Sequence, residues 1–142
     1  MKNWIEIASH SELSAVQELK KSFDEGDLID VEEGLTQLID VMAKAEQRAL
    51  LSHITNLMMH IIKWNIQPEK RSRSWLKTIF NARNEVEFAQ EYNPSLNNNY
   101  IESIWEKAFS KAKKGAEIET GISTANIEIL TWQEVFEQEY NL

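Results

Sequence analysis

A helical period that continues from Asp30 to Ile66 constrains the fold of this chain more than any other feature. Its apolar positions are Leu35, Leu38, Ile39, Met42, Ala45, Ala49, Leu50, Ile54, Leu57, Met58, Ile61 and Ile62. Spacings of three and four residues place side chains on one face of an α-helix. Only four glycines and two prolines punctuate the 142 residues, and no window alternates like a half-buried strand. The sequence therefore predicts an all-α fold.

Capping residues and a proline indicate where the first two helical regions begin and end. We expect a first helix from Ser11, a typical N-cap residue, to about Phe23. Its predicted inward face consists of Leu13, Val16, Leu19 and Phe23. The 30–66 pattern fits one long helix or two that separate near Ala43-Lys44. Pro68 ends this region, because the residue before a proline avoids the helical conformation.

Three further helices complete the expected architecture. A third helix should begin at Ser72 or Ser74, and a fourth at Asn93-Pro94, with the asparagine as N-cap. A short acidic helix is expected over about 131–139. Since there is no internal repeat and no low-complexity tract, we predict a single bundle of about five helices over residues 1–142.

The composition narrows the environment and the chemistry. No cysteine is present, which excludes disulfides, thiolate catalysis and cysteine-bound zinc, and fits a reducing compartment. The first six residues lack the apolar run of a signal peptide. The most apolar segment, 54–66, is shorter than the roughly 20 residues that a membrane span needs. We therefore expect a cytoplasmic protein with no membrane partner.

Positive charge is concentrated in one segment of an acidic chain whose formal net charge is −8. Residues 60–83 carry six basic side chains and one acidic side chain. Residues 1–59 carry five basic and eleven acidic side chains, and residues 84–142 carry four and eleven. The acidic body opposes extensive contact with nucleic acid. The basic segment can hold a single anion, or it can dock on acidic faces of the protein itself.

The basic segment contains the candidate binding residues, which are His60, Lys63, Gln67, Lys70, Arg71, Arg73, Ser74 and Arg83. His60, Lys63 and Gln67 belong to a polar stripe on an apolar helix. This stripe is either the wet face of a central helix or the lining of a cleft. The cluster around Arg71 lies at a predicted helix N-terminus, which favours an anion. It can equally pair with carboxylates such as Glu33 or Glu119.

No pattern in the sequence indicates a metal or cofactor. The Glu-x-x-His pairs of di-metal helical bundles are absent, and His53 lies two helical turns from His60, too far to share one metal ion. No serine lies in a nucleophile elbow, and no glycine-rich loop is present to hold a phosphate. His60 is the one catalytic candidate, as a proton carrier.

The segment from His60 to Trp75 resembles a bacterial family, common in photosynthetic bacteria, known as domain of unknown function 29. The matching residues are His60, Lys63, Trp64, Gln67, Pro68, Glu69, Arg71, Arg73, Ser74 and Trp75. The likeness covers about residues 27–121. Gln37-Leu38 stands where the family commonly has an acidic pair, and Ala43 where it has a glycine. The resemblance implies a compact helical domain and no established activity.

These observations favour a non-enzymatic binding or regulatory module. Its basic turn, residues 60–77, would engage an anionic partner, which is an acidic protein segment or a nucleic-acid phosphate. The first alternative is a small phosphoester hydrolase or nuclease that uses His60 with Arg71 and Arg83. The second is a purely structural basic cluster without an external ligand. The chain could also form an oligomer.

Overall fold

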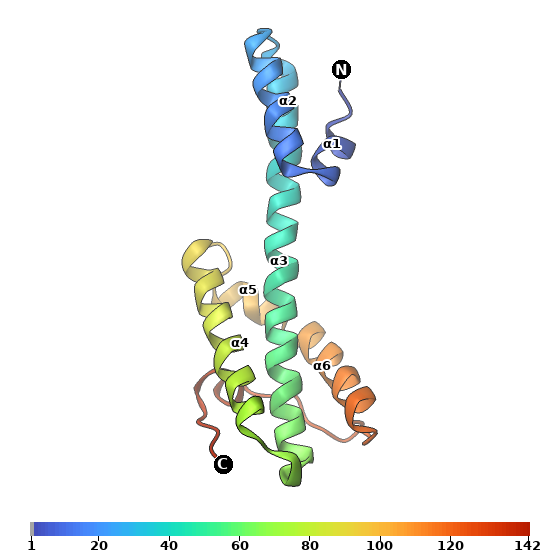
Figure 1. Ribbon diagram of the computed structural model, residues 1–142, viewed down its shortest axis with the longest axis vertical. Helices are drawn as coiled ribbons and strands as arrows, with labels where there is room; N and C mark the ends of the chain where they lie inside the picture. Colours follow the sequence, from blue (N-terminus) through green and yellow to red (C-terminus); the bar gives the residue numbers. More distant parts are fainter. Residues whose placement is uncertain (1) are drawn as a thin grey trace. The chain divides into compact units, whose positions relative to one another are not determined.

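The computed structural model describes residues 2–142 and confirms the predicted all-α fold. Of the described residues, 78% are helical and none is in a strand, and five of their helices have seven or more residues. The elements in Figure 1 are α1 Trp4–His10, α2 Glu12–Asp24, α3 Leu28–Ile66, η1 Pro68–Lys70, α4 Arg73–Tyr92, α5 Asn98–Ser103, α6 Trp105–Thr120 and η2 Gln133–Glu137. Among these residues, no helix is long and apolar enough to cross a membrane.

The 30–66 region forms one helix of 39 residues, α3. It continues through Ala43-Lys44 because alanine and lysine are both strong helix formers. The chain divides into two compact units, the first ending at Arg48 and the second comprising Ala49–Leu142. The helix α3 contributes residues to both units.

In the N-terminal unit, α1 and α2 pack with the first part of α3. The buried apolar residues are Trp4, Ala8, Ala15, Leu19 and Leu38. The indole Nε1 of Trp4 donates a hydrogen bond to Asp30 Oδ1 at 2.6 Å, and Ser22 Oγ donates to Asp30 Oδ2 at 2.8 Å. The hydrogen bond from Trp4 has the largest effect and lowers the pKa of Asp30, and the bond from Ser22 acts in the same direction. Burial of the carboxylate opposes both. Asp30 thereby links α3 to Trp4 on α1 and to Ser22 on α2.

A glycine on α3 permits this close packing. A Cβ atom at Gly34 would lie 2.6 Å from Leu19 Cδ2 and 2.8 Å from the Trp4 ring. Such distances are below van der Waals contact, so the helices can approach this closely only around glycine.

The predicted inward face of the first helix is wrong in three of its four positions. The predicted N-cap is correct, since Ser11 accepts a hydrogen bond from the backbone N–H of Ser14. Leu19 is buried, but the remaining three residues are exposed, Leu13 by 67%, Val16 by 50% and Phe23 by 63%. The reason is that α2 turns Ala15, Leu19 and Ser22 toward its neighbours instead. The short hairpin of α2 and α3 leaves the other apolar face of α2 uncovered.

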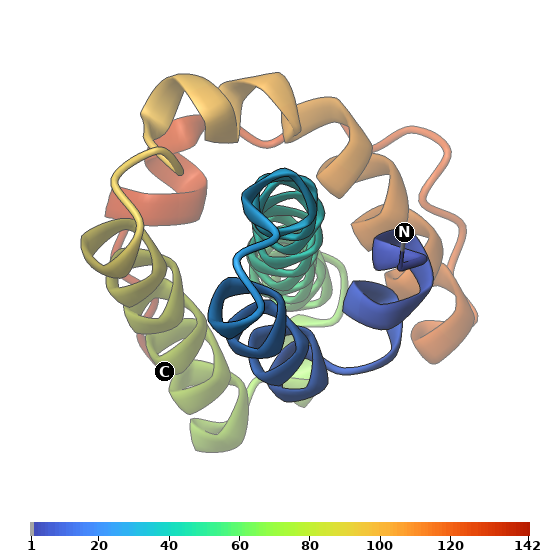
Figure 2. The ribbon, with the colours of Figure 1, turned by 90° about the horizontal axis from the view of Figure 1, so that it is seen from above.

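The C-terminal unit is built around the second part of α3. Seen along this helix, α4, α5, α6 and the C-terminal segment surround it (Figure 2). Its most buried side chains, each at most 1% exposed, are Leu50, Ile54, Leu57, Met58, Ile61 and Ile62. They pack against the inner faces of α4 and α6, which include Ile79, Val86, Ala108 and Ala112.

Some element boundaries differ from the predictions. The third predicted helix, α4, has Ser72 as its N-cap. The fourth is divided at Ile104 into α5 and α6. Its N-cap is Asn97, whose Oδ1 accepts from the Tyr100 N–H, whereas Asn93 Oδ1 accepts hydrogen bonds from Ser95 within a turn. Both asparagines suit a cap, and the residues that follow decide between them.

The C-terminal segment is less helical than predicted and packs against α6. Only Gln133–Glu137 is helical, in a π-helical turn, where we expected a helix over about 131–139. Val135 is fully buried, and the Trp132 and Phe136 rings lie 5.5 and 5.9 Å from the Trp105 ring. Trp105 Nε1 also donates a hydrogen bond to the Leu130 carbonyl at 2.8 Å.

Candidate binding surface on the C-terminal unit

Two arginines flank a pair of aromatic rings in the C-terminal unit. The Arg71 guanidinium lies over the Trp64 ring, with its carbon 4.9 Å from the ring centroid. The Trp64 ring meets the Tyr140 ring edge to face at 6.0 Å, and the Arg83 guanidinium lies 5.6 Å from the Tyr140 centroid. We call these four residues the arginine–aromatic stack. It links the end of α3 to α4 and to the C-terminal segment.

Hydrogen bonds from both arginines hold this stack in place. Arg71 Nε donates to the Trp64 carbonyl at 2.9 Å, which satisfies one of the free carbonyls at the end of α3. Arg83 donates from Nε to the Val135 carbonyl and from Nη2 to the Gln138 carbonyl, each at 2.8 Å. Both arginines therefore bind the chain's own backbone.

Burial changes the ionisation of two members of the stack. It lowers the pKa of Arg83, an effect that the neighbouring Tyr140 opposes. Burial also raises the pKa of Tyr140 to about 12, so the phenol is neutral at physiological pH. The Tyr140 hydroxyl donates to the Glu134 carbonyl at 2.6 Å. The neutral Tyr140 hydroxyl beside the Arg83 cation therefore fits a structural contact between α4 and the C-terminal segment.

Lys63 is also engaged within the protein. Its Nζ lies 2.7 Å from Glu119 Oε2 and 4.9 Å from the Trp75 ring centroid, and its side chain is only 12% exposed. The glutamate is the carboxylate that the sequence suggested as a partner for Arg71, and lysine takes it instead. Gln67, at the end of the same stripe, is buried. The polar stripe of α3 is thus largely covered.

His60 is half-buried and bonded to its own helix. Its Nδ1 lies 2.9 Å from the Asn56 carbonyl. Burial lowers the pKa of His60, while the bond to Asn56 and the charge of Glu119 oppose this change. The contacts of Arg71 and Arg83 run to other partners, so these contacts do not join either guanidinium to His60.

Four cations of the basic segment are exposed, and one of them, Arg71, is held by Trp64. Lys70, Arg73 and Lys77 are exposed, and within residues 2–142 their side chains show no hydrogen bond or ion pair. Arg73 and Lys77 are four residues apart on α4 and therefore share a face. The exposed Ser74 does not cap α4, because Ser72 does.

Exposed aromatic side chains continue along the outside of α4. Phe80, three residues after Lys77, is 65% exposed. The Phe88 and Tyr92 rings stack at 6.4 Å and are 64% and 74% exposed. We define the α4 outer surface as Arg73, Lys77, Phe80 and Phe88 of α4 together with Lys70 of the preceding turn η1. It combines cations at one end with aromatic rings along its length, a composition that suits contact with another molecule.

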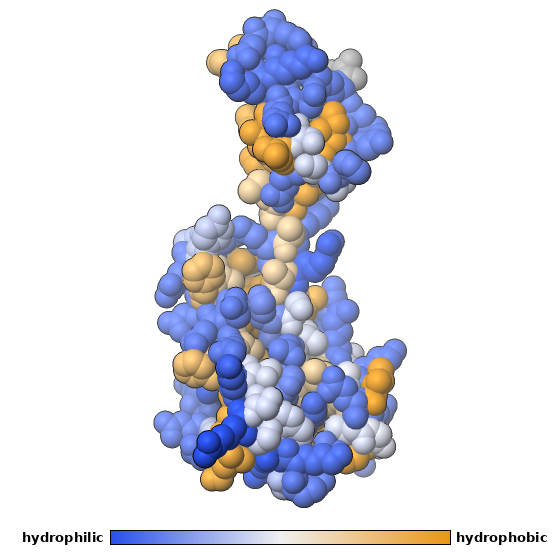
Figure 3. Space-filling model, in the orientation of Figure 1, coloured by the Kyte–Doolittle hydropathy of each residue, from blue (hydrophilic) through white to orange (hydrophobic). Residues whose placement is uncertain are grey.

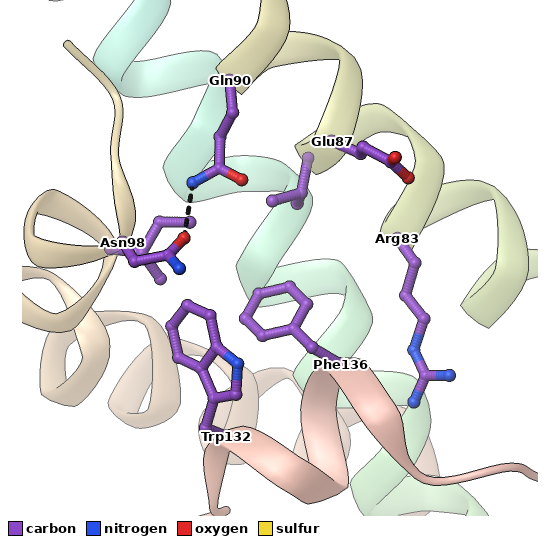
Figure 4. Close-up of a pocket in the computed structure, with 8 residues that line it drawn as sticks. Arg83, Glu87, Gln90, Asn98, Trp132 and Phe136 are labelled. Atoms are coloured by element: carbon purple, nitrogen blue, oxygen red, sulfur yellow. Dashed lines mark hydrogen bonds between the residues drawn. The ribbon is translucent and has the colours of Figure 1, made fainter. Parts of the chain in front are cut away.

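A pocket of about 270 Å³ is lined by Arg83 and by residues of α4, α5 and the C-terminal segment (Figure 4). Its polar wall comes from α4 and α5, where Gln90 Nε2 donates to Asn98 Oδ1 at 2.9 Å. The Trp132 and Phe136 rings form its apolar wall. The eight residues that line it include no histidine, serine or lysine, and its charged groups are the Glu87 carboxylate and the Arg83 guanidinium.

The predicted site residues thus separate into two groups. Lys63, Arg71 and Arg83 have partners within the unit, although Arg71 is exposed, and Gln67 is buried. His60 lies beside Lys63. Lys70, Arg73 and Ser74 face outward. Sequence reasoning did not assign Tyr140 and Phe80 to the site. The signal for Phe80 was its helical register with Arg73 and Lys77, whereas nothing local to Tyr140 indicates that it contacts Trp64.

Comparison with known proteins adds a family and no activity. The model of the family described as "Domain of unknown function DUF29" matches residues 12–141. This range extends the resemblance beyond residues 27–121 to include the exposed face of α2 and Tyr140. No curated protein and no solved structure matches the chain.

Proposed function

We propose a non-enzymatic protein-binding role for this chain, which belongs to the DUF29 family. The α4 outer surface would bind an acidic segment of a partner protein that also carries apolar side chains. The partner's carboxylates would meet Lys70, Arg73 and Lys77, and its apolar side chains would cover Phe80 and Phe88. The proposed setting is the cytoplasm of a bacterium.

The observation that most supports this proposal is that, within residues 2–142, half of the cations in the basic segment have a partner and the other half do not. Lys63, Arg71 and Arg83 each have a partner inside the protein. Lys70, Arg73 and Lys77 have none among the described residues, yet they lie together in the chain and two of them share a helical face. Electrostatic complementarity of this kind directs association and sets its specificity.

A protein segment suits the α4 outer surface better than a nucleic acid does. A nucleic-acid strand presents a phosphate at every step, so it requires a continuous basic track. Along α4, the cations are followed by Glu85, Glu87 and Glu91, which would repel such a strand. An acidic peptide needs to contact only the basic end, and its apolar residues can pack on the exposed rings.

The hydrolase alternative receives less support from the contacts. A phosphoester hydrolase would need an acid or base and cationic groups around one phosphate. Arg83 is bound to three carbonyls of the C-terminal segment, Arg71 is stacked on Trp64, and His60 lies beside Lys63. These groups have separate partners.

A binding titration with three probes tests the proposal. The first is a fluorescein-labelled peptide of glutamate, leucine and phenylalanine, the second its glutamine version, and the third a single-stranded oligonucleotide. Fluorescence anisotropy should show binding of the acidic peptide, which weakens as salt increases. The double variant Arg73→Glu/Lys77→Glu should lower the affinity at least about tenfold.

A matched variant on α6 provides the control. Lys107 and Lys111 are also exposed and four residues apart. The change Lys107→Glu/Lys111→Glu therefore alters the net charge equally and should leave peptide affinity within about twofold of the original. Equal losses in the two variants, or stronger binding of the oligonucleotide, would show the proposal to be incorrect.

A further inference from the structure

The N-terminal unit exposes more large apolar side chains than it buries. Its buried core contains only Trp4, Leu19 and Leu38 besides alanines. The exposed residues are Ile5, Leu13, Val16, Phe23, Leu28, Ile29, Leu35, Ile39 and Met42, at 43–73% of their full area. A unit of this size has little core from which to gain stability. Figure 3 shows apolar side chains at the surface over α1, α2 and the adjoining part of α3.

Seven of these side chains form two stripes on the hairpin of α2 and α3. Leu28, Leu35, Ile39 and Met42 follow one another on α3 at spacings of seven, four and three residues. Leu13, Val16 and Phe23 follow on α2 at three and seven. We call these seven residues the apolar hairpin face. Phe23 and Leu28, at the ends of the two stripes, lie on either side of the turn between the helices.

This face points away from α1. On α3, Asp30 and Gly34 lie against Trp4 of α1, and Leu38 belongs to the same buried cluster. Leu35 is displaced from Gly34 by about 100° around the helix axis, and Leu28, Ile39 and Met42 lie near Leu35. The helix α1, which is the remaining helix of this unit, therefore does not cover the apolar hairpin face.

The exposed area matches what a stable dimer buries. Each of the seven side chains exposes on the order of 100 Å², which gives about 700 Å² of apolar area. A standard interface buries about 800 Å² on each partner, of which a little more than half is apolar. The apolar hairpin face alone thus approaches the area that one partner contributes.

We propose that a second copy of this chain covers the apolar hairpin face. Because most soluble oligomers are two-fold symmetric, the same face of each copy would meet the other, and α2 and α3 of both would form a four-helix contact. Lys20 interrupts the stripe on α2, and Glu32 interrupts the stripe on α3. When α2 of one copy meets α3 of the other with both turns at the same end, Glu32 lies opposite Lys20, which in the single chain pairs with Asp24 at 2.9 Å. This inference is independent of the α4 outer surface.

Salt dependence distinguishes this contact from others. Residues 1–48 carry eleven acidic and five basic side chains, so two such units repel each other. Salt screens that repulsion and strengthens apolar burial, so the symmetric dimer should become tighter as salt increases. A contact between this acidic unit and the Lys70–Lys77 segment of another copy would instead become weaker as salt increases.

Sedimentation of the full chain over a range of concentrations tests the proposal. We expect a monomer–dimer equilibrium that shifts toward dimer between low and high sodium chloride. Because each dimer contains residue 39 twice, Ile39→Asp should weaken dimerisation at least about 100-fold. Leu28→Asp should act in the same direction. Ile118→Asp alters an equally exposed isoleucine on α6 and should leave the dimer intact.

Circular dichroism of each variant verifies that its helices remain folded. The proposal is overturned if the chain is monomeric at every concentration, or if folded Ile39→Asp and Leu28→Asp dimerise as the original does. It is also overturned if the dimer dissociates at high salt, which would indicate contact with the basic segment. A monomer whose apolar hairpin face is protected from hydrogen exchange would indicate coverage from within the chain, and would also overturn it.

Discussion

Replacement of Arg83 by alanine should destabilise the C-terminal unit substantially, although the residue resembles a surface cation in the sequence. Its guanidinium makes two hydrogen bonds of 2.8 Å to backbone carbonyls and lies on the Tyr140 ring. Hydrogen bonds to charged groups contribute about 1.5–3 kcal/mol when buried, and the partial exposure of this arginine reduces each to about 1 kcal/mol. The contact with the ring adds roughly 0.5–1 kcal/mol. The expected loss is therefore about 3 kcal/mol.

Urea unfolding followed by tryptophan fluorescence measures this loss. Four of the five tryptophans belong to the C-terminal unit, so the signal reports mainly on it. With a slope of about 2 kcal/mol per molar urea, the midpoint should fall by about 1.5 M. Arg83→Lys should lose about half as much, because lysine keeps the charge but cannot bond both carbonyls in the same way.

Arg73 provides the matched control on the same helix. Its side chain is exposed and has no partner among the described residues, so Arg73→Ala should change the free energy of unfolding by less than about 0.5 kcal/mol. If Arg83→Ala and Arg73→Ala have equal effects on the midpoint, then the hydrogen bonds of Arg83 do not stabilise the unit, and the division into internal and external cations is mistaken.

Two further changes test the packing of each unit. Gly34→Ala should cost about 1–3 kcal/mol, seen as faster hydrogen exchange in residues 2–48, because the new Cβ would lie 2.6 Å from Leu19. Gly115→Ala should cost much less, since the nearest atom is the sulfur of the flexible Met59 side chain at 2.9 Å. Tyr140 has a folded pKa raised to about 12, above the ordinary value of about 10, so its contribution is complete below pH 10 and is lost as the pH rises toward 12. Absorbance and stability measured over this range should show that loss, and Tyr140→Phe should abolish it.

The helical framework could be predicted because its signals are local. The period of α3, the break at Pro68 and the N-cap at Ser11 depend on residues close together in the sequence. The short helix α1 was not predicted, because a tertiary contact between Trp4 and Asp30 holds it rather than its own length. Likewise, the pattern on α2 correctly indicated a helix but could not show which of its two apolar faces would be covered.

The roles of the basic residues could not be predicted because they depend on distant partners. Arg71 and Arg73 are two residues apart and have the same chemistry. Arg71 lies where the Trp64 ring and carbonyl are within reach, whereas Arg73 begins α4 on its solvent side. The position of the Trp64 ring depends in turn on Tyr140, near the opposite end of the unit. A sequence pattern identifies such a cluster, but only the packed structure assigns its members.

This division of roles also explains how an acidic chain can maintain a basic surface. Charges of one sign that are held close together repel, so six cations in one short segment would destabilise it if all faced solvent. Here Lys63 is neutralised by Glu119, while Arg71 and Arg83 are held by carbonyls and aromatic rings. The contact of Arg71 with Trp64 and that of Lys63 with the Trp75 ring lie at the joint between α3 and α4, next to the cations of the α4 outer surface. Changes to the inner group should therefore lower stability at constant affinity, and changes to the outer group should lower affinity at constant stability.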